Sequence, residues 1–131
     1  MTGVQTCALP ISVAASAVNL AGDLITTGAL NGAGAGYTGG AVTVDTTNGV
    51  IAVNNITTTG GAGTGAAGGA AGNITLDTSN NNVITLNGDL TAEGGAGTAQ
   101  GAGGVITVAD PAVLGAAVTV SSGTGTINLS P

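Results

Sequence analysis

Short segments in which a polar or small residue lies between two larger apolar residues recur along the chain at a nearly fixed spacing. One set is evenly spaced and occupies 18–20, 51–53 and 84–86. A second evenly spaced set occupies 42–44, 74–76 and 106–108. A third, looser set occupies 23–26, 55–58 and 89–92. Because residues two positions apart face the same side of a strand, the pattern predicts three short β-strands in each repeat.

Strands of this length cannot form a stable sheet within one repeat, but each can pair with its equivalent in the next repeat, about 4.8 Å away. The pairing predicts buried apolar columns, of which the clearest is Val42, Ile74 and Ile106. It also predicts an outward column of threonines: Thr43, Thr75 and Thr107. We therefore predict an all-β fold, a right-handed, three-sided parallel β-helix of about 3.5 coils, in which each coil buries its inner row only by stacking.

Glycine and alanine dominate one part of each predicted coil, at 28–40, 60–72 and 94–104. These stretches have no apolar period, so we predict loops that leave the stack at one corner. The repeats then cover roughly 18–50, 51–83 and 84–116, followed by a partial repeat at 117–131 that lacks the loop and has its expected strands at 118–120 and 127–129. The predicted coils have no obvious polar cap, which favours a segment of a longer rod.

Charge is almost absent from the chain and is of one sign. There is no Lys, Arg or His among 131 residues, and the formal net charge is −6. Binding of nucleic acid requires cations that displace phosphate counterions, so this class of function is excluded. Histidine, the commonest general base, is also missing. We predict no catalytic, cofactor-binding or metal site and no cofactor, and no apolar run reaches membrane-spanning length.

The first eleven residues, MTGVQTCALPI, differ abruptly in composition from the rest and contain the only cysteine, Cys7. They resemble the translation of a common short-read sequencing adapter. On this interpretation 1–11 is not native, the solenoid occupies 12–131, and the targeting signal of the parent protein is not present. The alternative is a signal peptide, which is disfavoured because the segment has no positively charged start.

Two acidic residues are candidates for chemistry because the repeat places them on adjacent coils. Asp45 and Asp77 occupy the same position in successive repeats, and paired carboxylates can serve glycoside hydrolysis or bind a cation weakly. The third repeat has Ala109 at this position, with Asp110 displaced by one residue. We therefore favour two solvated turn residues that repel each other by less than ~1 kcal/mol in water.

Several motifs are typical of a known class of bacterial surface protein. They are the GGAVTV and GNITL strands at 39–44 and 72–76, the GDL turns at 22–24 and 88–90, and the Gly/Ala loops. Over 18–129 the chain resembles the repetitive passenger region of filamentous haemagglutinin-like and related β-strand-repeat adhesins. It lacks an NPNG or NPNL motif, which leaves the secretion route open.

The resemblance implies a secreted or cell-surface, outer-membrane-associated rod that mediates attachment. Its partners would be a glycan or protein on a host or environmental surface, together with further coils of its own solenoid. The alternative function is an ice- or carbohydrate-surface-binding solenoid that uses the threonine column. An enzyme is the least favoured class.

Overall fold

The computed structural model describes residues 10–131 and contains three parallel β-sheets with no helix in that range. Sheet A consists of β1 (Ile11–Ala15), β4 (Val42–Thr46), β7 (Ile74–Thr78), β10 (Ile106–Val108) and β13 (Ile127–Leu129). Sheet B consists of β2 (Val18–Leu20), β5 (Ile51–Val53), β8 (Ile84–Leu86) and β11 (Ala112–Leu114). Sheet C consists of β3 (Leu24–Ile25), β6 (Ile56–Thr57), β9 (Leu90–Thr91) and β12 (Val120–Ser121). No helix in the described part of the chain is long and apolar enough to cross a membrane.

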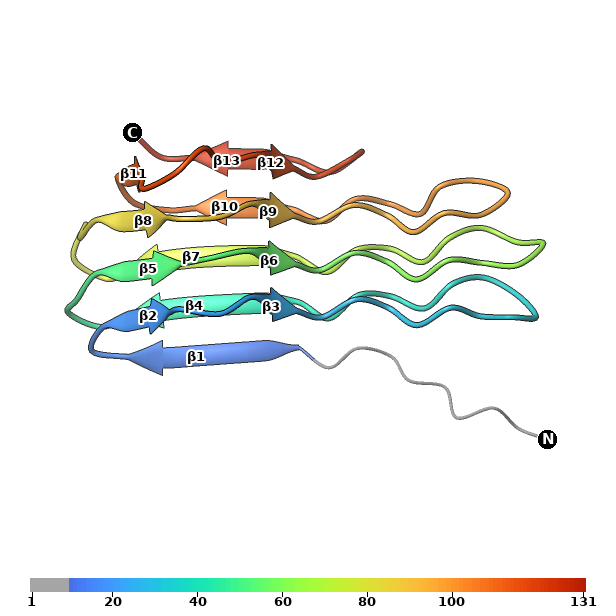
Figure 1. The fold of residues 1–131 in the computed structure, drawn as a ribbon, viewed down its shortest axis with the longest axis horizontal. Helices are drawn as coiled ribbons and strands as arrows, with labels where there is room; N and C mark the ends of the chain where they lie inside the picture. Colours follow the sequence, from blue (N-terminus) through green and yellow to red (C-terminus); the bar gives the residue numbers. More distant parts are fainter. Residues whose placement is uncertain (1–9) are drawn as a thin grey trace.

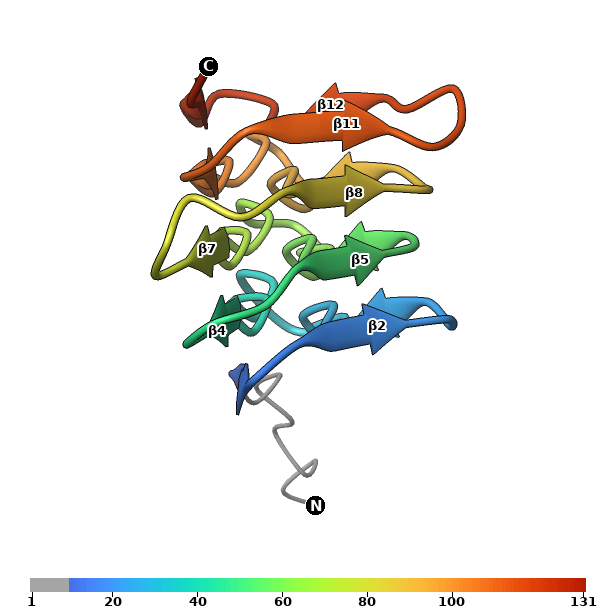
Figure 2. The same cartoon turned by 90° about the vertical axis from the view of Figure 1, so that its left-hand side faces the viewer.

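The chain visits sheets A, B and C in turn and returns to sheet A one level higher, so the fold is a parallel β-solenoid, as predicted (Figures 1 and 2). We call β1–β3 the first coil, β4–β6 the second, β7–β9 the third and β10–β12 the fourth, and β13 follows the fourth. Every strand pairs in parallel with its equivalent in the neighbouring coil, and the predicted partners Val42, Ile74 and Ile106 stand in register.

The core of the solenoid is a set of apolar columns that run along its axis. Inward-facing residues of the second and third coils are completely buried, whereas the residues between them are only half-buried or exposed. The largest fully buried side chains are Ile51, Ile56, Ile74, Leu76, Ile84, Leu86, Leu90 and Ile106. Each such side chain stabilises the fold by about 1.5–3 kcal/mol relative to an exposed one. No aromatic residue is needed, because the space inside a coil is narrow.

Three strands depart from the sequence prediction. β1 and β11 were not predicted, and β12 begins at Val120 although 118–120 was expected to be the strand. Ile11 pairs with Val42, so the last residue of the segment predicted to be non-native belongs to the first strand. Residues 1–9 of that segment, with Cys7, lie outside the described residues.

The Gly/Ala-rich stretches form three long arms that leave the body between sheets C and A and lie one above another (Figure 1). The predicted position at one corner is therefore correct. The arms are not irregular loops, however, because their backbones are hydrogen-bonded from coil to coil. Gly28 N–H donates to the Thr59 carbonyl at 2.8 Å, and Gly60 N–H donates to the Glu93 carbonyl at 3.0 Å. The fourth coil replaces the arm with a short connection at 122–126.

Candidate functional site

The threonine column lies on the outward face of sheet A, where the sequence placed it. Thr43 is the register partner of Thr75, and Thr75 is the partner of Thr107. Ser12 extends the column on β1, and Asn128 extends it on β13. The result is one straight row of small polar side chains spaced by the strand separation of about 4.8 Å.

The two carboxylates predicted to stack, Asp45 and Asp77, are register partners on β4 and β7. Asp77 is exposed, whereas Asp45 is half-buried, and its Oδ1 atom is buried without a hydrogen-bond partner. A fully solvated pair was expected, so the prediction is wrong for this oxygen of Asp45. The physical reason is that Asp45 has strand partners on both sides, Ala14 and Asp77, whereas β10 ends at Val108 and leaves Asp77 with a partner on one side only.

The sequence analysis noted Asp110 as displaced from the row of Asp45 and Asp77 but missed its role at this corner. Only 4% of its surface is exposed, and its Oδ2 accepts hydrogen bonds from Thr78 N–H at 2.5 Å and from Thr78 Oγ1 at 2.9 Å. The signal was present in the sequence, because Thr46, Thr78 and Asp110 are evenly spaced at the interval of the repeat. Asp110 therefore takes the place of a buried threonine in the next coil and supplies an acceptor to the coil below.

The corner has a distinct electrostatic character. Burial raises the pKa of Asp77 above its ordinary value, and the negative charges of Asp110 and Asp45 and a hydrogen bond with Asp110 raise it further. Since the Asp77 side chain is exposed, solvent weakens these effects. Among residues 10–131, no group of three or more His, Cys, Asp or Glu side chains is arranged to hold a metal ion. The corner is therefore a cluster of acidic side chains that repel one another.

A second acidic row lies at the turn before sheet C and has a structural explanation. Asn55 Nδ2 donates to Asp23 Oδ1 at 3.0 Å, and Asp89 N–H donates to Asn55 Oδ1 at 2.8 Å. Asp89 Oδ1 in turn accepts from Thr119 N–H at 2.8 Å. Equivalent turns of successive coils are thus joined by side-chain hydrogen bonds, and a similar bond joins Asn80 to Asn48 at the turn after sheet A.

A buried hydroxyl closes the base of most of the arms, and these residues were also missed. Thr58 Oγ1 donates to the Gly72 carbonyl at 2.7 Å, while Gly72 N–H donates to the Thr58 carbonyl at 2.8 Å. Thr26 makes the equivalent bond to Gly40, and Ser122 bonds to the carbonyl of Gly125 in the short connection. The available signal was that Thr26 and Thr58 are separated by the interval of the repeat.

Glycine at the centre of the arms is required by the close approach of backbones. Gly61 N–H donates to the Tyr37 carbonyl, Gly69 N–H donates to the Gly61 carbonyl, and Gly95 N–H donates to the Gly69 carbonyl, at 2.8–2.9 Å. A Cβ atom on Gly61 or Gly69 would lie inside the contact distance of a backbone carbonyl oxygen. As in collagen, only glycine fits where backbones pack this closely.

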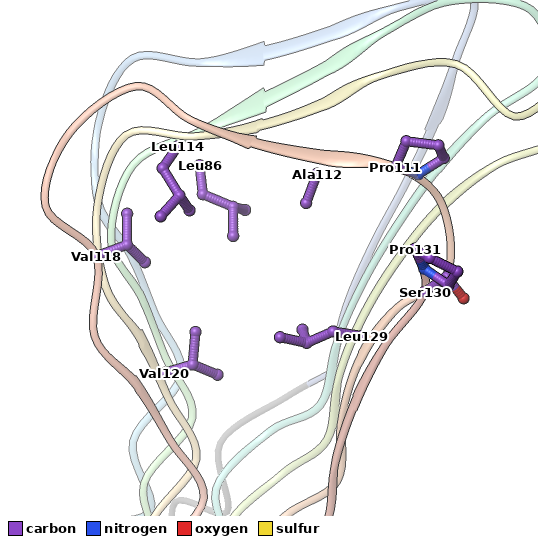
Figure 3. Close-up of a pocket in the computed structure, with 9 residues that line it drawn as sticks. All are labelled: Leu86, Pro111, Ala112, Leu114, Val118, Val120, Leu129, Ser130 and Pro131. Atoms are coloured by element: carbon purple, nitrogen blue, oxygen red, sulfur yellow. The ribbon is translucent and has the colours of Figure 1, made fainter.

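The last apolar feature is the open upper end of the body, shown in Figure 3. Residues of β8, β11, β12 and β13 surround a hollow whose lining is mainly apolar, with Leu86 at its floor. Leu114 and Leu129 are 61% and 57% exposed there. This hollow continues the buried columns of the body and contains no polar cluster that would orient a ligand.

Comparisons of the chain with protein-family models, with curated proteins and with solved structures find no match. The functional argument therefore depends on the geometry described above.

Proposed function

We propose that this chain is a structural and adhesive segment of an exported bacterial surface protein, in which it forms part of a rod-like stalk and performs no catalysis. The observation that carries the proposal is the repetition of the same contacts from coil to coil, in the body and in the arms alike. Such a stack gives a stiff module whose length grows with the number of coils. The sides of the module carry no positive charge, so attachment would use polar contacts and shape.

The arms support the adhesive part of the proposal. They place three chain segments at one edge, away from the body, where a surface glycan or protein can reach them (Figure 1). Leu30 on the first arm is 65% exposed. Hydrogen bonds between the arms limit the entropy that would be lost on binding, which favours affinity.

The test is attachment of the purified chain, immobilised on beads, to epithelial cells, matrix proteins and a glycan array. We expect binding to at least one of these surfaces. A Leu30→Asp variant should weaken it, and an Ile25→Asp variant, altered at an exposed residue of the body, serves as the matched control. Failure of well-folded protein to bind any surface would contradict the adhesive role, and release of cleaved glycan would contradict the absence of catalysis.

The threonine column favours a second candidate function, binding to ice or to a crystalline carbohydrate surface. The specific observation is the strict register of Thr43, Thr75 and Thr107. Thermal hysteresis of the purified chain tests it. Thr75→Arg should abolish hysteresis, whereas Thr85→Arg, an outward position on sheet B, should not. Absence of hysteresis in the unaltered chain would eliminate the ice-binding candidate.

A further inference from the structure

Three carboxyl groups from three successive coils lie at the corner between sheets A and B. Asp45 and Asp77 are register partners on adjacent strands. Asp110 follows β10 and reaches back to the third coil, where it binds both the N–H and the hydroxyl group of Thr78, the residue next to Asp77. The corner therefore connects the second, third and fourth coils through acidic side chains.

No basic side chain compensates these charges. The residues at the equivalent outward positions of the first and fourth coils are Ala14 and Ala109, and the adjoining turns contain only neutral residues between 47 and 50 and between 79 and 83. The sequence has no Lys, Arg or His anywhere. Asp45 Oδ1 is buried and lacks a donor. Two ionised carboxyl groups can only repel each other, because both accept hydrogen bonds and neither donates. When one of them binds a proton, it becomes a donor and can form a hydrogen bond with the other.

We propose that Asp45, Asp77 and Asp110 form an acid-responsive fastening that holds the second, third and fourth coils together more firmly when the corner has bound a proton than when all three groups are ionised. The proton comes from solvent and is carried by the outermost carboxyl group, Asp77. It supplies a hydrogen bond between Asp77 and Asp110, which joins the third and fourth coils, and it removes the charge that repels Asp45 on the second coil. This inference does not depend on the adhesive role.

The direction of the pH dependence follows from the titration of Asp77. Burial, then the charges of Asp110 and Asp45, raise its pKa in the folded chain above the value in the unfolded chain. A group with a raised folded-state pKa binds protons more tightly when folded. Its contribution to stability is therefore complete below the unfolded pKa, about 3.9 for Asp, and is lost as the pH rises through the folded-state pKa.

The experiment is urea unfolding of the whole chain, followed by circular dichroism, at about pH 3, below the pKa of Asp in the unfolded chain, and at about pH 7, above the pKa range of Asp in folded proteins. We expect a higher urea midpoint in acid. An Asp77→Asn variant places a neutral donor beside Asp110, so its midpoint at neutral pH should rise and its acid-induced shift should fall to about half or less. Asp23→Asn, altered at the turn before sheet C, is the matched control and should keep the full shift.

Three results would overturn the proposal. The first is an Asp77→Asn variant with the same pH dependence as the unaltered chain. The second, measured by carbon NMR without any substitution, is an Asp77 carboxyl that titrates no higher in the folded chain than in urea. The third is stabilisation by calcium ions at neutral pH equal to that produced by acid, which would assign the corner to cation binding instead.

Discussion

The body and the arms of this solenoid stack the same coils by opposite means. In the body, side chains fill the space between strands, and residues such as Ile74 and Leu76 are fully buried. In the arms, the outgoing and returning chain segments pack through their backbones, and glycines such as Gly61 and Gly69 contact each other directly. The body is therefore sensitive to the removal of atoms, whereas the arms are sensitive to their addition.

This difference shows how a chain with one Tyr, no Phe and no Trp can form an ordered structure. Apolar burial supplies the main driving force where the coil is closed. In the arms, beyond the base where Thr26 and Thr58 form their hydrogen bonds, the chain is ordered by backbone hydrogen bonds, each worth only about 0.5–1.5 kcal/mol net. We therefore expect the arms to open more readily than the body.

The largest effect is expected from Ile74→Ala in the centre of the body. The substitution removes a fully buried side chain from a column that is covered above and below. It should lower the free energy of unfolding by about 2–5 kcal/mol, measured by urea denaturation. Thr75→Ala, the adjacent outward residue, should change it by less than ~1 kcal/mol. Equal losses for the two variants would contradict the assignment of inward and outward faces.

A smaller loss is expected when a methyl group is added to the centre of an arm. Gly61→Ala forces backbones apart and should cost about 1–3 kcal/mol, with faster amide exchange confined to the arms. Gly32→Ala is the control, because a Cβ atom there has nothing within 4 Å. By restricting the unfolded chain, that substitution should be neutral or stabilise the protein by up to about 1 kcal/mol. The same sign for both variants would show that the arms are not packed through glycine.

The smallest loss of stability is expected from a substitution at the base of an arm, where the arm joins the body. Thr58→Val keeps the volume of the side chain but removes the hydroxyl that donates to the Gly72 carbonyl. We expect a loss of about 1–2 kcal/mol and increased exchange of Gly72 N–H, which bonds to the Thr58 carbonyl. Thr57→Val, on the outward face of sheet C, should leave that exchange unchanged. Unaltered exchange in both variants would rule out a fastening role for the hydroxyl.

The sequence predicted the body well because inward positions alternate visibly with polar ones and recur at a constant spacing. Strand β11 was missed because its triplet, Ala-Val-Leu, directly follows Pro111 and does not show the apolar–polar–apolar pattern. Strand β1 was missed because the adjoining eleven residues were separated from the repeat on the basis of their composition.

The arms and the acidic corner were harder to predict. Packing between glycine backbones leaves no apolar period in the sequence. The repeat therefore predicted where the arms lie but not that they are hydrogen-bonded to one another. Asp110 was compared with the outward row of Asp45 and Asp77, whereas it occupies the inward column of Thr46 and Thr78. A polar residue that replaces a buried threonine is recognised only when the inward register is already known.

The short connection at 122–126 has a practical consequence. The fourth coil lacks an arm, yet β12 still pairs with β9 and β13 still pairs with β10. Strand pairing in the body therefore tolerates large changes in the length of the connection between sheet C and sheet A. A designer could replace arm tips with foreign peptides on chosen coils and obtain a multivalent display scaffold, with adjacent epitopes held about 4.8 Å apart along the axis.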